Sequence, residues 1–193
     1  MTAQGSIDDL YDGRESPLHT AKLGLRVFIV VASVLFSLSV VAYGDRMTLG
    51  DWRPLPEPWL LWLNTAILIS SSVALQRALV SARRGQMDGV RAGLTAGCVL
   101  ALAFLAGQLV VWQQLIGLGY FAATNPANAF FYMLTALHGL HLLGGLVICG
   151  RTTTKVWHGS EVAEVRLSVE LCTVYWHFLL VVWFVLFGLL LLT

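Results

Sequence analysis

Charged residues are scarce in this sequence: Asp, Glu, Lys and Arg make up 12% of its 193 residues. Soluble globular domains carry about a quarter of such residues. With 57% apolar residues and a mean hydropathy of +0.74, the chain has too little polar surface to cover a water-soluble core. Its net charge of +1 includes no basic cluster, which excludes a nucleic-acid-binding protein. The composition therefore indicates an integral membrane protein.

Cysteine is also rare, and its three positions carry no chemical signature. Cys98, Cys149 and Cys172 lie far apart in apolar runs, so their spacing predicts neither a disulfide framework nor a zinc site. The sequence also lacks a phosphate-binding loop, a carboxylate cluster for a metal and a nucleophile suitably spaced from a base. We therefore expect no catalytic, metal or cofactor site in this chain.

Long charge-free runs predict an all-α membrane bundle of five transmembrane helices, because one crossing needs about 20 apolar residues. The run from Ala92 to Gly150 is too long for one crossing, and a turn signal from Gly117 to Asn125-Pro126 divides it in two. We expect spans near residues 23–43, 59–77, 93–116, 129–150 and 169–192, within a membrane domain of residues 23–193. Residues 1–22 are expected to form a cytoplasmic N-terminal arm.

Basic residues between the spans predict the orientation. Arg46 and Arg53 are the two that fall on one side of the predicted bundle. Ten fall on the other side: Arg14, Lys22, Arg26, Arg77, Arg83, Arg84, Arg91, Arg151, Lys155 and Arg166. Because cytoplasmic loops are enriched in Lys and Arg, we expect a cytoplasmic N-terminus and a C-terminus on the outer side.

Titratable side chains inside the membrane are confined to the last two spans. They are His138, His141, Glu170 and His177. The polar side chains of the first three spans are amides and hydroxyls. His141 and His177 are each nine residues from the inner boundary of their span, which places both about 13 Å deep at 1.5 Å per residue. We therefore expect these two histidines to face each other.

Three interpretations of these histidines remain open. They are a b-type haem held by two helices, a proton or ion path through Glu170, and a polar cluster that fixes packing or holds a lipid headgroup. We favour the third, because Tyr175 and Trp176 crowd the edge of His177 and two spans make a thin path. The predicted cluster comprises His138, His141, Glu170, Tyr175, Trp176 and His177.

Two long motifs resemble subunit III of haem-copper respiratory oxidases, the cytochrome c oxidase subunit 3 family. One begins at Phe130, reads Phe-Phe-Tyr-Met-Leu-Thr-Ala-Leu-His-Gly-Leu-His and continues to Gly145. The other begins at Glu170, reads Glu-Leu-Cys-Thr-Val-Tyr-Trp-His-Phe and has Trp183 behind it. Leu63-Asn-Thr and Ser70-Ser-Ser are similar to the family's second serine-rich helix, and residues 24–43 resemble the opening helix of its short five-helix bacterial form.

The resemblance implies a non-catalytic subunit of a terminal oxidase in a bacterial plasma membrane. Haem and copper would belong to catalytic subunit I and to subunit II, and electrons would come from cytochrome c or quinol. Subunit III would pack on subunit I, hold phospholipid in a cleft between its first two helices and the other three, and support proton uptake. Outside this family, a self-standing membrane cytochrome b or a transporter stays open as an alternative.

Three positions depart from the family pattern. The family places carboxylates where this chain has Ala32, Val111 and Leu180. All three replacements are apolar and cannot titrate, which suggests a divergent branch. The accessory protein of a nitric oxide reductase is the alternative within the family.

The first two spans lack titratable groups, so we expect them to meet a partner through close packing and a few hydrogen bonds. In a membrane, small residues allow helices to approach closely. The predicted interface residues are Ser33 and Ser37 on the first span, with Asn64, Ser71 and Ser72 on the second. Bonding of each serine to its own backbone is the alternative.

Overall fold

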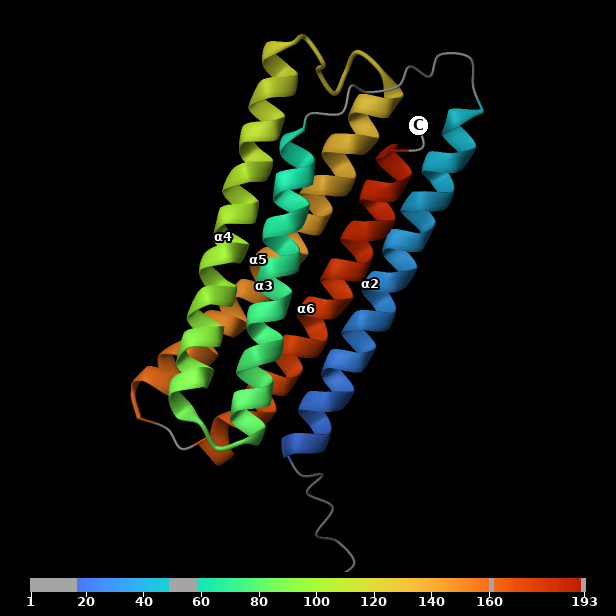
Figure 1. Ribbon diagram of the computed structural model, residues 1–193. Coiled ribbons are helices and arrows are strands. Elements are labelled where there is room, and N and C mark those ends of the chain that lie inside the picture. The colour runs from blue at the N-terminus through green and yellow to red at the C-terminus, as the bar shows by residue number, and fades with distance from the viewer. Residues whose placement is uncertain (1–16, 49–58, 160–161, 192–193) are drawn as a thin grey trace, which may run out of the picture.

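The computed structural model describes residues 17–48, 59–159 and 162–191, and these residues form five helices (Figure 1). They are α2 (Pro17–Met47), α3 (Leu60–Arg83), α4 (Met87–Gly117), α5 (Pro126–Trp157) and α6 (Val162–Leu191). Each is long and apolar enough to cross a membrane, so the prediction of an all-α bundle with five spans is confirmed. Residues 1–16 of the predicted arm lie outside the described residues, and residues 17–22 are helical rather than part of an arm.

The helices are longer than the predicted spans because they continue beyond their charge-free stretches. α4, for example, begins four residues before Arg91, at Met87. Proline is compatible with the first helical position, where its missing N–H has no partner to lose, and both α2 and α5 begin with one. At the start of α5, the Asn125 side chain accepts a hydrogen bond of 3.1 Å from the Ala127 amide. This cap confirms the predicted break between the third and fourth spans.

Successive helices run in opposite directions, so α2, α4 and α6 begin at the same end of the bundle (Figure 1). Exposed basic residues gather at this end, which we call the basic end: Lys22, Arg26, Arg83, Arg84, Arg151, Lys155 and Arg166. The short turn between α3 and α4 lies here and contains Gly85 at φ 71°, a left-handed conformation that glycine adopts without steric cost.

Helices α3 to α6 form a closed ring in which each packs against the next and α6 packs back against α3. α2 lies outside this ring, against α6 and α5 (Figure 1). The resemblance placed the first two helices together on one side of a cleft, and this expectation is wrong. α3 belongs to the ring, and α2 alone forms the other side.

The closest packing in the ring joins α3 and α4, and glycines of α4 make it possible. A Cβ atom at Gly93 would lie 2.7 Å from the Cβ of Ala78 and 2.8 Å from the carbonyl oxygen of Ala74. No side chain larger than hydrogen fits there without moving a helix. Small residues at a membrane helix interface allow two helices to approach this closely. Apolar side chains that face lipid do not by themselves drive such an approach.

Candidate functional site

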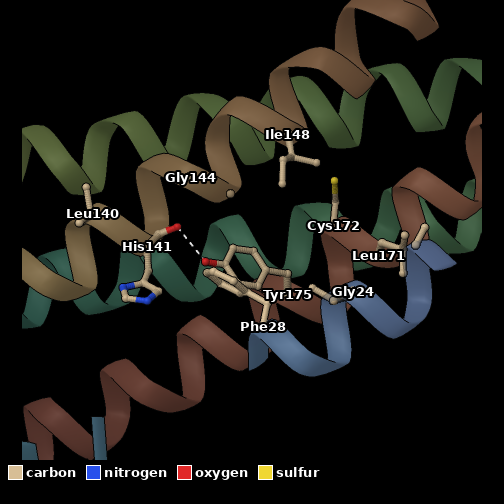
Figure 2. Close-up of a pocket in the computed structure, with 12 residues that line it drawn as sticks. Gly24, Phe28, Leu140, His141, Gly144, Ile148, Leu171, Cys172 and Tyr175 are labelled. Atoms are coloured by element: carbon tan, nitrogen blue, oxygen red, sulfur yellow. Dashed lines mark hydrogen bonds between the residues drawn. The ribbon is translucent and has the colours of Figure 1, made fainter. Parts of the chain in front are cut away.

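A cavity of about 610 Å³ lies between α2, α5 and α6 in the half of the bundle nearer the basic end (Figure 2). Its volume falls in the range of about 300–1,000 Å³ that is common for small-molecule sites. Its wall includes Gly24 and Phe28 of α2, His141 and Gly144 of α5, and Cys172 and Tyr175 of α6. The cavity therefore separates the outlying helix from the ring.

Glycines leave this space open. A Cβ atom at Gly24 or at Gly144 would meet nothing within 4 Å, because each faces the cavity. The next residue behaves differently: a Cβ at Gly145 would lie 2.6 Å from the Cε1 atom of Tyr175. The Tyr175 ring thus occupies the space at Gly145, and the volume beside Gly24 and Gly144 stays unfilled by protein.

Two polar groups of the cavity wall are hydrogen-bonded within the protein. The Tyr175 hydroxyl donates a hydrogen bond of 2.9 Å to the main-chain carbonyl of His141 (Figure 2). The Nδ1 atom of His141 lies 2.8 Å from the Leu137 carbonyl, which can only accept, so Nδ1 carries the proton. No Asp, Glu, Lys or Arg of the described chain lines the cavity. The wall suits an apolar occupant such as an acyl chain.

His138 and His141 share one face of α5 but occupy different surroundings. His138 is fully buried, and the rings of Phe36, Phe104 and Trp183 lie 6.5, 5.9 and 5.2 Å from it between centroids. Neither of its ring nitrogens has a hydrogen-bond partner in the described part of the chain. His141 is half-buried, with its ring centroid 5.2 Å from that of Phe36. His138 is thus a packing residue among aromatic rings.

The expected pairing of His141 with His177 is wrong. His177 is exposed on α6, and its Nδ1 atom lies 2.7 Å from the carbonyl of Thr173 on its own helix. Tyr175, two residues earlier, takes the place beside His141. Two residues correspond to a rotation of about 200° around a helix axis, so His177 points away from His141 when Tyr175 points toward it. Glu170 is half-buried on α6.

Two tryptophans of α6 donate hydrogen bonds to side chains of α3, and the Thr173 hydroxyl of α6 lies 3.3 Å from the Leu75 carbonyl of α3. The Trp176 indole nitrogen donates to the Ser71 hydroxyl over 2.9 Å, and the Ser71 hydroxyl donates to the Gly97 carbonyl of α4 over 2.8 Å. The Trp183 indole nitrogen donates to the Thr65 hydroxyl over 2.9 Å. Indoles and hydroxyls thus join three helices of the ring in its interior.

These contacts correct the predicted interface on α3. Asn64, Ser71 and Ser72 are all buried within the chain, so they do not face a partner. The amide nitrogen of Asn64 lies 3.5 Å from the Gln108 side-chain oxygen. The sequence did not reveal this inward orientation, because α3 is apolar on most sides and its serines gave no periodic signal.

On α2, the Ser33 hydroxyl donates to the Ile29 carbonyl over 2.7 Å and is half-buried, whereas Ser37 is exposed. Their contact with a partner stays a prediction. Of the three positions that depart from the family pattern, Ala32 is 3% exposed, Val111 is fully buried and Leu180 is half-buried. Apolar side chains at Ala32 and Val111 therefore suit the interior positions that they occupy.

The structure brings together three residues that sequence spacing had set aside. The Cys98 and Cys149 sulfurs are 3.0 Å apart, although 51 residues separate them in sequence. Cys172 packs against Cys149 from α6. The signal for this cluster is that the three cysteines lie at similar levels along their helices. Each is 8 to 11 residues from the basic-end boundary of its helix, at Met87, Trp157 or Val162.

Comparison with known proteins agrees with the architecture. The family model described as cytochrome c oxidase subunit III matches residues 15–192. Cytochrome c oxidase subunit 3 of Thermostichus vulcanus is 32% identical over 173 residues, which cover 87% of this chain and 85% of that protein. The protein of the same name from Synechocystis sp. is 32% identical over 174 residues, covering 85% and 72%. A probable cytochrome c oxidase subunit 3 of Mycobacterium leprae is 33% identical over 145 residues, covering 72% and 69%. With all five helices inside the matched region, this chain belongs to the cytochrome c oxidase subunit III family.

Proposed function

We propose that this chain is the non-catalytic subunit III of a haem-copper terminal oxidase. The observation that carries the proposal is the family match over residues 15–192, which includes every described helix. In such a complex, electrons from cytochrome c or quinol reduce oxygen to water at haem and copper in subunits I and II. This chain acts on that reaction through packing and bound lipid rather than through a redox centre of its own.

The catalytic subunit I is the partner that we propose for α2, within a complex that also contains subunit II. α2 is the least buried of the five helices and presents apolar side chains over most of its surface. Val30, Leu38 and Val41 are each more than 60% exposed. Ser37 is exposed on the same helix and is small enough to permit a close crossing. These features support docking by shape rather than by charge.

A phospholipid is the ligand that we propose for the cavity. The apolar wall accommodates an acyl chain, and exposed Lys22 and Arg26 flank Gly24 on α2. Arg151 and Lys155 of α5 and Arg166 of α6 are exposed at the same end. Basic side chains near a membrane surface attract anionic headgroups. The apolar cavity wall thus suits the acyl chain, and the basic side chains suit the headgroup.

We place the protein in the bacterial plasma membrane, with the basic end in the cytoplasm. This orientation rests on the excess of Lys and Arg at one end of the bundle. Support for proton uptake is then indirect, through lipid and packing at the partner's cytoplasmic side. Ala32 and Val111 are buried where the family pattern has carboxylates, so neither position can exchange a proton.

A self-standing cytochrome is disfavoured by the placement of the histidines. His138 is enclosed by three aromatic rings, which leaves no room for a porphyrin beside it. The other two histidines that could hold a haem between two helices are His141 of α5 and His177 of α6. His177 does not point toward His141. A membrane transporter is disfavoured because the cavity wall holds no charged side chain among the described residues.

Purification through an affinity tag on this chain tests the proposed function. In mild detergent, we expect the tagged chain to bring down a haem-containing catalytic subunit with its copper centre. A reduced-minus-oxidised spectrum then shows haem bands, which vanish when the chain is separated from its partner. Haem bands that stay with the isolated chain contradict the proposal.

The same preparation separates the two acceptors within the family. Because Ala32, Val111 and Leu180 replace family carboxylates, an accessory protein of a nitric oxide reductase is the second candidate. Consumption of oxygen by the purified complex supports the oxidase. Consumption of nitric oxide without oxygen consumption assigns the chain to the second candidate.

A further inference from the structure

The three cysteines of the chain meet where α4, α5 and α6 pack together. Cys149 lies in the middle, with its sulfur 3.0 Å from the sulfur of Cys98 on α4. Cys172 contacts it from α6, on the other side. All three are free thiols. The cluster is separate from the contacts to which we assign partner docking, and it shares Cys172 alone with the cavity.

The three thiols differ in access. Cys149 is fully buried, whereas Cys98 is half-buried between α4 and α5. The Thr153 hydroxyl lies 3.8 Å from the Cys98 sulfur and donates its own proton to the Cys149 carbonyl over 2.9 Å. Its oxygen therefore presents lone pairs to the Cys98 thiol. A small reagent reaches Cys98 first, and the nearest sulfur to it belongs to Cys149.

We propose that Cys98 and Cys149 form a peroxide-oxidised dithiol site that covalently joins α4 to α5. In the first step, the Cys98 sulfur attacks one oxygen of a hydroperoxide, the O–O bond breaks, and Cys98 becomes a sulfenic acid while water or an alcohol leaves. In the second step, the Cys149 sulfur attacks the Cys98 sulfur and water leaves. Two thiols lose two electrons and two protons in total, and the peroxide is reduced by two electrons.

Geometry favours this pair over the alternatives. A disulfide has a sulfur–sulfur distance of about 2.05 Å, so the two sulfurs must approach by about 1 Å. Side-chain rotation within the packed ring supplies a movement of that size. Because Cys149 can bond one partner at a time, a bridge to Cys98 leaves Cys172 as a thiol facing the cavity.

A cleavable loop between α4 and α5 makes the bridge visible in the intact complex. Ala122 and Ala123 are exposed in this loop, and a protease site inserted between them divides the chain into an N-terminal piece with Cys98 and a C-terminal piece with Cys149 and Cys172. The purified complex is treated with hydrogen peroxide, free thiols are then alkylated, and the loop is cut. We expect the two pieces to migrate together without reductant and to separate with it.

Alkylation before and after peroxide provides the second measurement. We expect two of the three thiols to become unreactive, with a mass loss of two hydrogens and full recovery after reduction. Cys149→Ala should abolish the joined band, and Cys172→Ala should retain it. Cys98→Ser serves as a second variant that should abolish it.

Several outcomes overturn the proposal. Pieces that separate without reductant after saturating peroxide show that no bridge forms between α4 and α5. A joined band in Cys149→Ala assigns the bridge to Cys98 and Cys172 instead. Pieces already joined in a sample alkylated before peroxide show a permanent disulfide. A gain of oxygen atoms without joining shows overoxidation in place of a dithiol reaction.

Discussion

The indole nitrogen of Trp176 donates a hydrogen bond of 2.9 Å to the hydroxyl of Ser71, which lies 105 residues earlier in the chain. Ser71 in turn donates to the main-chain carbonyl of Gly97 over 2.8 Å. One small side chain thus joins α6, α3 and α4 at a fully buried point. Both Trp176 and Ser71 lie inside the apolar ring, where water does not replace a lost partner.

Ser71→Ala is expected to lower the free energy of unfolding by about 1–2 kcal/mol, because the buried Trp176 N–H loses its acceptor. The neighbouring variant Ser70→Ala is the matched control. Ser70 is exposed and its hydroxyl donates to the Ala66 carbonyl of its own helix, so we expect a change below about 0.5 kcal/mol. Denaturant titration of both variants in mixed micelles measures the difference. Equal losses would show that the contact between helices adds nothing.

His138→Leu is expected to leave the stability unchanged or to raise it slightly. His138 is buried with both ring nitrogens unpartnered among the described residues, and an apolar side chain of similar volume removes that desolvation cost. His138→Ala, by contrast, leaves a cavity between Phe104 and Trp183 and should cost about 2–5 kcal/mol. Thermal unfolding in detergent compares the two. A large loss in His138→Leu would indicate a hydrogen-bond partner, such as a bound water.

Gly144→Leu is expected to prevent binding of the phospholipid that we propose for the cavity. A Cβ at Gly144 meets nothing within 4 Å, so a leucine side chain enters the cavity without displacing protein atoms. Gly44→Leu is the control, since Gly44 is exposed, also has open space at its Cβ and does not line the cavity. We expect less phospholipid per complex in the first variant alone, measured by native mass spectrometry and by lipid extraction. Unchanged phospholipid in Gly144→Leu would mean that the lipid binds elsewhere.

Ser37→Trp is expected to release the chain from its catalytic partner without altering the partner's haem spectrum. Ser37 is exposed on α2, and an indole at this position prevents a close helix crossing. Leu102→Trp is the control, because Leu102 is 53% exposed on α4, away from the proposed docking helix. Pull-down through a tag on this chain measures retention. Full retention of Ser37→Trp, or release by both variants, would remove this face of α2 from the interface.

The number of helices could be predicted from the sequence, but the rotation of each helix about its axis could not. Charge-free runs give the crossings, and a rise of 1.5 Å per residue gives the depth of each side chain. Rotation is read from an amphipathic pattern, which a helix with apolar residues on every side lacks. The sequence therefore predicts neither the face of α6 on which His177 lies nor the inward orientation of Ser71.

The cysteine cluster and the set of helices that line the cavity could not be predicted, for a different reason. Both depend on which helices are neighbours in space. Short connections predict contact between helices that follow each other in the chain, but not between other pairs of helices. Cys98 and Cys172 belong to helices separated by a third, and Gly24 and Gly144 to helices separated by two others. Contacts of this kind join distant parts of the chain, so local patterns carry no record of them.

The position of α2 outside the ring has a consequence for biogenesis. Among the described helices, α2 precedes the others in the chain, but its docking surface consists of α5 and α6, which come last in that order. During synthesis, α2 therefore enters the bilayer before the two helices against which it packs in this structure. The cavity forms only when α2 docks on α5 and α6, so the phospholipid proposed as its ligand would enter from the surrounding membrane at that step. On that proposal, the lipid composition of the membrane at that moment determines which molecule each newly made copy carries.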